Sequence, residues 1–124
     1  MSVLGELQPN KVFKYFEEIC SIPHGSRNLQ QISDYLVDFA KAHELKYRQD
    51  EDLNVIIWKD GSKGYEASEP VILQGHMDMV AVKEADCDKD MEKEGLDLEI
   101  NGDYISAKGT SLGGDDGIAV AYTL

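Results

Sequence analysis

The apolar run Val71-Ile72-Leu73 is the feature that most limits which folds this chain can adopt, because it leads directly into the polar segment Gly75-His76-Met77-Asp78. An uninterrupted apolar run predicts a strand over 71–74 that is buried on both faces. Side chains two residues apart on a strand point to the same side, so His76 and Asp78 share one face. Open α/β sheets bind their ligands beyond the carboxyl ends of strands. An imidazole and a carboxylate at such a position are candidates for a metal site, and a structural histidine is the alternative.

A second acidic segment, Gly113-Gly114-Asp115-Asp116-Gly117, precedes an apolar helical pattern. Its glycines permit a sharp turn and a close approach of the backbone, and a helix N-terminus puts partial positive charge beside Asp115. Asp115 is therefore a candidate metal ligand. The alternative is an acidic N-cap, which explains Asp115 but neither Asp116 nor the flexible backbone before it.

Hydrophobic periodicity predicts the elements around these two segments. A helix is expected from Pro9 to Cys20, and a second helix over 29–40 with Ser26 or Asn28 as its N-cap. Strands are expected over 45–49, 54–58, 71–74, 96–100 and 104–107, the last two joined by a hairpin turn at Asn101-Gly102. With a further helix after the glycine-rich segment, the pattern indicates an α/β fold whose helices pack on a mixed sheet.

Length and charge limit the classes of function. The 124 residues suffice for one hydrophobic core, and the final helical pattern lacks capping signals, so we expect a truncated piece of a longer domain. A formal net charge of -12 disfavours nucleic acid and anionic lipid as partners. No apolar stretch is long enough for a membrane span and no secretory signal is recognisable, so a cytoplasmic protein is expected. Cys20 and Cys87 are expected to be free thiols.

Three segments of the chain resemble, in order and spacing, the start of the dinuclear zinc peptidases of the M20 type. They are Ser21-Ile22-Pro23-His24-Gly25-Ser26, Gly75-His76-Met77-Asp78-Met79-Val80 and Gly109-Thr110-Ser111-Leu112-Gly113-Gly114-Asp115-Asp116-Gly117-Ile118-Ala119. Within that group the chain is most similar to the aminoacyl-histidine (Xaa-His or cytosol nonspecific) dipeptidases. The resemblance implies that residues 1–124 are the N-terminal portion of a metallopeptidase catalytic domain, without the rest of that domain and without the lid domain.

The resemblance also implies roles for the polar residues. His76 is expected to ligate one zinc ion, Asp78 to hold His76 in place, and Asp115 to bridge two zinc ions through its two oxygens. Asp116 is expected to be structural, and the peptide bond between Asp115 and Asp116 is expected to be cis, as it often is in the family. Aminoacyl-histidine dipeptidases often carry Asn after the bridging aspartate, so Asp116 leaves the exact subgroup open.

The function implied for the full-length parent is hydrolysis of short peptides such as Xaa-His by a metal-bridged hydroxide, with two zinc ions as cofactors. Relatives form homodimers through the lid domain, so the parent is expected to form one too. The family's adjacent Glu-Glu pair, which supplies the general base and a ligand, and its later Asp and His ligands are expected beyond Leu124. The isolated chain is therefore expected to be inactive and to bind zinc weakly.

Other readings of the sequence remain open. Gly109-Thr110-Ser111-Leu112-Gly113 matches the GxSxG elbow of serine hydrolases, although too few residues follow Ser111 to supply an acid and a histidine. A non-catalytic, peptidase-like binding domain is the third reading. The acidic run 86–97 begins like a calcium loop, but Met91 stands where the turn needs glycine, which favours a solvated surface loop. His24 lies in a turn and is expected to be no ligand.

Overall fold

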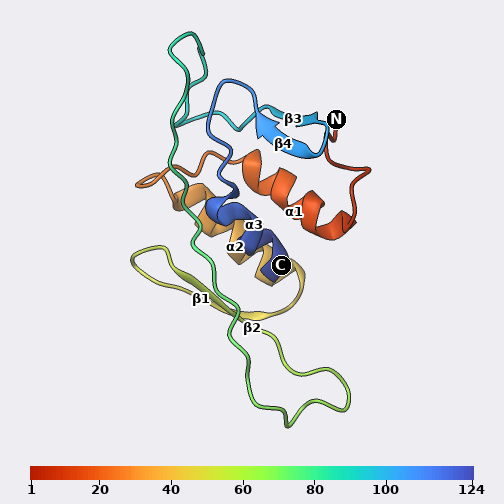
Figure 1. Cartoon of the computed structure of the whole chain (residues 1–124). Coiled ribbons are helices and arrows are strands. Elements are labelled where there is room, and N and C mark those ends of the chain that lie inside the picture. The colour runs from red at the N-terminus through yellow and green to blue at the C-terminus, as the bar shows by residue number, and fades with distance from the viewer. The chain divides into compact units, whose positions relative to one another are not determined.

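The computed structural model describes all residues 1–124 and divides into two compact units, residues 1–32 with 74–124, and residues 33–73. The first unit is built on helices α1 (Asn10–Cys20) and α3 (Gly114–Thr123), which lie side by side in Figure 1. They approach closely at Gly117, where an added Cβ would lie 3.3 Å from Cε2 of Phe16. The predicted first helix is confirmed, with Pro9 as its N-cap residue.

A hairpin of strands β3 (Leu98–Asn101) and β4 (Tyr104–Ala107) completes the regular structure of the first unit. Asn101 pairs with Tyr104, so the connecting residues are Gly102 and Asp103, one position later than predicted, and Gly102 has a φ of 61°. The core of this unit combines side chains from the N-terminal segment, both helices, β3 and the segment after His76: Leu4, Phe16, Ile19, Cys20, Met79, Leu98, Val120 and Ala121.

The second unit contains most of helix α2 (Gln30–Ala42) and an antiparallel hairpin of strands β1 (Lys46–Gln49) and β2 (Val55–Trp58). Polar contacts join the helix to the hairpin. The buried Ser33 hydroxyl donates a hydrogen bond to the Leu53 carbonyl oxygen at 2.7 Å and accepts one from Gln49 Nε2 at 2.8 Å. Helix α2 begins at Gln30, so Ser26 is not its N-cap residue, and the Ser26 hydroxyl bonds to Asp78 instead.

The α/β class is confirmed, but two details of the predicted strands are wrong. Residues 71–74 form no strand and appear in Figure 1 as a green trace without an arrow. Val71, Ile72 and Leu73 are 83%, 87% and 69% exposed, because this run finds no neighbouring strand to accept its backbone hydrogen bonds or cover its faces. The apolar run of β2 was expected, by the same reasoning, to be buried on both faces, but its alternate residues Ile56 and Trp58 are exposed. No helix of the chain combines the length and apolar character of a bilayer span.

Candidate metal centre

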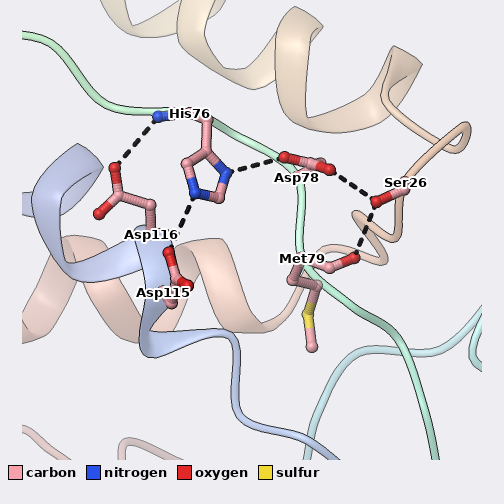
Figure 2. Close-up of polar contacts among 6 residues, drawn as sticks. All are labelled: Ser26, His76, Asp78, Met79, Asp115 and Asp116. Atoms are coloured by element: carbon pink, nitrogen blue, oxygen red, sulfur yellow. Dashed lines mark hydrogen bonds and ion pairs between the residues drawn. The ribbon is translucent and has the colours of Figure 1, made fainter.

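His76 and Asp78 lie on an extended segment without regular secondary structure, and their side chains meet as the sequence predicted. His76 Nδ1 lies 2.8 Å from Asp78 Oδ1 (Figure 2). The bond leaves Nε2 as the ring atom that faces away from Asp78. An imidazole held in this way presents one nitrogen in a fixed direction, which is what a metal ligand requires.

Asp115 approaches the same imidazole from the start of helix α3. Its Oδ1 lies 3.0 Å from His76 Nε2, and its side chain is 94% exposed. The backbone at Asp115 (φ -89°, ψ 103°) and Asp116 is not helical, and the peptide bond between them is cis, as the family resemblance implied. Gly113, with a φ of 73°, makes the turn before them. The glycine-rich segment therefore brings Asp115 to the ring atom that Asp78 leaves free.

Asp116 joins the two segments of the site through the backbone. Its Oδ2 accepts a hydrogen bond from the His76 N–H at 3.2 Å (Figure 2). Gly75 makes room for this contact, since an added Cβ there would lie 3.1 Å from the same oxygen. The two aspartates at the start of α3 thus contact opposite ends of one residue, Asp115 the ring of His76 and Asp116 its main chain.

Protonation of His76 is favoured by its two carboxylate neighbours. Hydrogen bonds first to Asp78 and then to Asp115 raise the pKa of His76 above its ordinary value. Hydrogen bonds from Ser26 and then from His76 lower the pKa of Asp78. Two carboxylates beside one imidazole attract positive charge, so the position between His76 Nε2 and Asp115 Oδ1 suits a proton or a metal cation.

The two candidate ligands nearly fit one zinc ion. Zinc binds histidine nitrogen and carboxylate oxygen at about 2.0–2.2 Å in tetrahedral sites, which places the two donor atoms about 3.4 Å apart. His76 Nε2 and Asp115 Oδ1 are separated by 3.0 Å, so a movement of about 0.4 Å accommodates the ion. No three His, Cys, Asp or Glu side chains of the chain are grouped to hold a metal ion. The donor set fits zinc but provides only two ligands.

Sequence reasoning missed the contact that Ser26 makes. Its hydroxyl donates a hydrogen bond to Asp78 Oδ2 at 2.6 Å (Figure 2). Its backbone N–H donates to the Met79 carbonyl oxygen at 3.0 Å. Ser26 belongs to the first of the three recognised segments, so a signal was present, although the sequence gave it only the meaning of a helix cap. An open cavity of about 800 Å³ adjoins Ser26 and Met79 and is lined by residues 25–28, 79–81, 83 and 88–92.

Ser111, the candidate serine nucleophile, and His24 both make contacts that hold the backbone in place. The Ser111 hydroxyl donates to the Val80 carbonyl oxygen at 2.6 Å and accepts from the Val82 N–H at 3.2 Å, so it ties two loops together. His24 is 2% exposed and its Nδ1 lies 2.6 Å from the Ile22 carbonyl oxygen, which anchors the turn before α2. Burial lowers the pKa of His24.

The acidic side chains of residues 86–97 contact their own loop, and the two cysteines form no disulfide. In the acidic run, Asp97 pairs with Lys89 at 3.1 Å, and Asp90 Oδ1 accepts the Glu92 N–H at 3.0 Å, which are contacts within a surface loop. Cys20 and Cys87 are both free, as expected, and Cys20 is buried.

Two known dipeptidases are similar to the chain over nearly its whole length. It is 39% identical to the cytosol non-specific dipeptidase of Escherichia coli (strain K12) over 124 residues, which is 100% of the chain and 26% of that protein. The crystal structure of aminoacylhistidine dipeptidase from Vibrio alginolyticus matches 98% of the chain and 25% of its own length, with 37% identity and a TM-score of 0.94. The chain therefore spans about a quarter of the length of either relative. No family model matches it.

Identity at this level, together with a shared fold, shows that the chain is a homologue of these dipeptidases. The resemblance drawn from the three sequence segments is confirmed. Because the chain corresponds to only part of each relative, the comparison shows descent from a peptide hydrolase and no more.

Proposed function

We propose that this homologue of the aminoacyl-histidine dipeptidases contributes His76 and Asp115 to the metal centre of a zinc-dependent dipeptidase. The observation that carries the proposal is the 3.0 Å separation of His76 Nε2 and Asp115 Oδ1, two zinc-binding atoms brought together from distant segments. Asp78 orients the imidazole through Nδ1. The exposed Asp115 carboxylate has a second oxygen that could hold a second zinc ion.

The role of each residue follows from its contacts. When bound, zinc polarises a peptide carbonyl and lowers the pKa of water toward about 7, which makes hydrolysis feasible at neutral pH. Asp78 accepts a hydrogen bond from Nδ1–H, so Nε2, once it has lost its proton, is the nitrogen that would be presented to the ion. The exposed carboxylate of Asp115 lies opposite that nitrogen. Asp116 accepts the His76 N–H and so holds the main chain of His76 against the start of α3.

The chain alone supplies too few groups for catalysis. Hydrolysis by paired metal ions also needs further ligands and a base that takes a proton from water. We therefore expect the isolated 124 residues to be inactive and to bind zinc weakly, with activity arising only when the missing groups are present. The intact protein is proposed to be a cytoplasmic homodimer that hydrolyses short peptides such as Xaa-His and does not bind nucleic acid or membranes.

A segment exchange tests the proposal. Residues 1–124 replace the homologous quarter of the Escherichia coli relative, and hydrolysis of an Xaa-His dipeptide is measured. We expect chelator-sensitive activity that zinc restores, and a loss of at least about 100-fold on His76→Ala or Asp115→Ala. His43→Ala and Asp103→Ala, which change an exposed histidine and an exposed aspartate outside the three recognised segments, are the matched controls.

Two results would separate the rival readings. Activity that resists chelators but is blocked by a fluorophosphonate at Ser111 would support a serine hydrolase. A folded, zinc-containing chimera without any hydrolysis would support a binding domain. The hydrogen bonds of the Ser111 hydroxyl to Val80 and Val82 favour the structural role of that serine instead.

A further inference from the structure

The carboxylate of Asp78 is held at both of its oxygens. Oδ1 lies 2.8 Å from His76 Nδ1, and Oδ2 accepts the Ser26 hydroxyl at 2.6 Å (Figure 2). A carboxylate with one partner can rotate about its terminal torsion, which is a broad and soft degree of freedom. A second partner on the opposite oxygen removes that rotation. The Ser26 hydroxyl therefore fixes the plane in which Asp78 meets the imidazole.

The backbone places Ser26 against Asp78 independently of that hydroxyl. The Ser26 N–H donates to the Met79 carbonyl oxygen and the Met79 N–H donates to the His24 carbonyl oxygen, both at 3.0 Å. These bonds form an isolated parallel bridge between Gly25 and Met79. The close approach needs glycine at position 25, because an added Cβ would lie 2.9 Å from Cβ of Ala81.

The helix that follows does not use the Ser26 side chain. An N-cap hydroxyl bonds to backbone N–H groups two or three positions further along the chain. Helix α2 begins at Gln30, and the Ser26 hydroxyl bonds to Asp78, which is distant in sequence. A helix-capping role therefore does not explain this serine.

We propose that Ser26 is a positioning residue of the metal centre, acting through Asp78 on His76; this rests on the proposed function. The hydroxyl of Ser26 sets the orientation of Asp78, Asp78 sets the orientation of the His76 ring, and the ring presents Nε2 toward Asp115. Loss of groups that orient a metal-binding histidine typically lowers metal affinity about 10–100-fold. Because Ser26 acts through an intermediate residue, we expect the lower end, about 10-fold, on its removal.

The test compares Ser26→Ala, Ser26→Thr and Ser21→Ala in the 124-residue chain. Ser21 is the matched control, since its exposed hydroxyl also donates a 2.6 Å hydrogen bond, to the Glu18 carbonyl oxygen, but away from the site. Threonine keeps the hydroxyl, and the open cavity beside position 26 offers room for its methyl group. The readouts are Zn²⁺ affinity and the NMR signals of the His76 ring, including its hydrogen-bonded Nδ1 proton.

Ser26→Ala is expected to weaken Zn²⁺ binding about 10-fold and to shift or broaden the Nδ1 proton signal, while Ser26→Thr restores both. Ser21→Ala should change neither. Unchanged affinity and unchanged ring signals in Ser26→Ala would overturn the proposal, as would failure of threonine to rescue. If wild type and His76→Ala bind Zn²⁺ equally, the proposed function fails, and the metal-free Nδ1 signal alone then decides the role of Ser26.

Discussion

Gly113→Ala is expected to destabilise the chain through two separate effects at the turn that carries Asp115. The residue has a φ of 73°, a left-handed conformation that costs an L-residue roughly 1–2 kcal/mol. An added Cβ would also lie 2.9 Å from Sδ, 3.1 Å from Cβ and 3.2 Å from Cε of Met79. Met79 is 3% exposed, so its side chain cannot simply move into solvent. Overpacking of this kind costs about 1–3 kcal/mol, for a total of about 2–5 kcal/mol.

Gly102→Ala is the matched control, because it isolates the backbone effect. Gly102 has a φ of 61°, and a Cβ there would meet nothing within 4 Å. Its alanine variant should therefore lose only the roughly 1–2 kcal/mol of left-handed strain. The difference between the two variants, about 1–3 kcal/mol, measures the packing of the turn against Met79.

The assay is urea unfolding followed by circular dichroism, together with an NMR titration of His76. Gly113→Ala should lower the free energy of unfolding more than Gly102→Ala and should also lower the pKa of His76, because Asp115 is displaced from the ring. Equal losses of stability in the two variants would refute the packing of the Gly113 turn on Met79. An unchanged pKa of His76 in Gly113→Ala would show that the turn does not position Asp115.

Two further outcomes follow from the titrating groups. Asp78→Asn should bring the raised pKa of His76 down toward its ordinary value, as measured by NMR. The charged imidazole stabilises the fold fully below about pH 6.5, and this stabilisation is lost as the pH rises through the pKa of His76 in the folded chain. The free energy of unfolding of the variant should therefore fall less over that pH range. Burial raises the pKa of Cys20 to about 12, so native protein at mildly alkaline pH should be alkylated at Cys87 first, and faster labelling of Cys20 in a mass-spectrometric time course would contradict its burial.

The first two helices and the β3–β4 hairpin were predictable because their signals are local. The spacing of apolar residues identified α1 and α2, and the Asn101-Gly102 pair identified the β3–β4 hairpin with an error of one residue. The state of residues 71–74 was not predictable from pattern, because a strand exists only if another strand pairs with it. The apolar run gives the tendency to form a strand, while its exposure in the chain reflects the lack of a partner.

The site was predictable in part for a similar reason. The alternation of side chains on extended backbone fixed the His76–Asp78 contact, and the glycines around Asp115 indicated a special turn. The contact between His76 and Asp115 joins distant segments, so it came from family resemblance and not from spacing. Ser26 was marked only by its place in a recognised segment, and the bond from the His76 N–H to Asp116 had no sequence signal, because both contacts depend on how loops meet in three dimensions.

The most direct test of the metal centre is a Zn²⁺ titration of the ¹⁵N-labelled chain, in which both ring nitrogens of His76 are followed by NMR. We predict that zinc replaces the proton on Nε2 while Nδ1 stays protonated and hydrogen-bonded to Asp78, and that Asp115→Asn weakens this response. Zinc binding at Nδ1, or an Nε2 response that is the same in wild type and Asp115→Asn, would contradict the convergence of His76 and Asp115 on one ion.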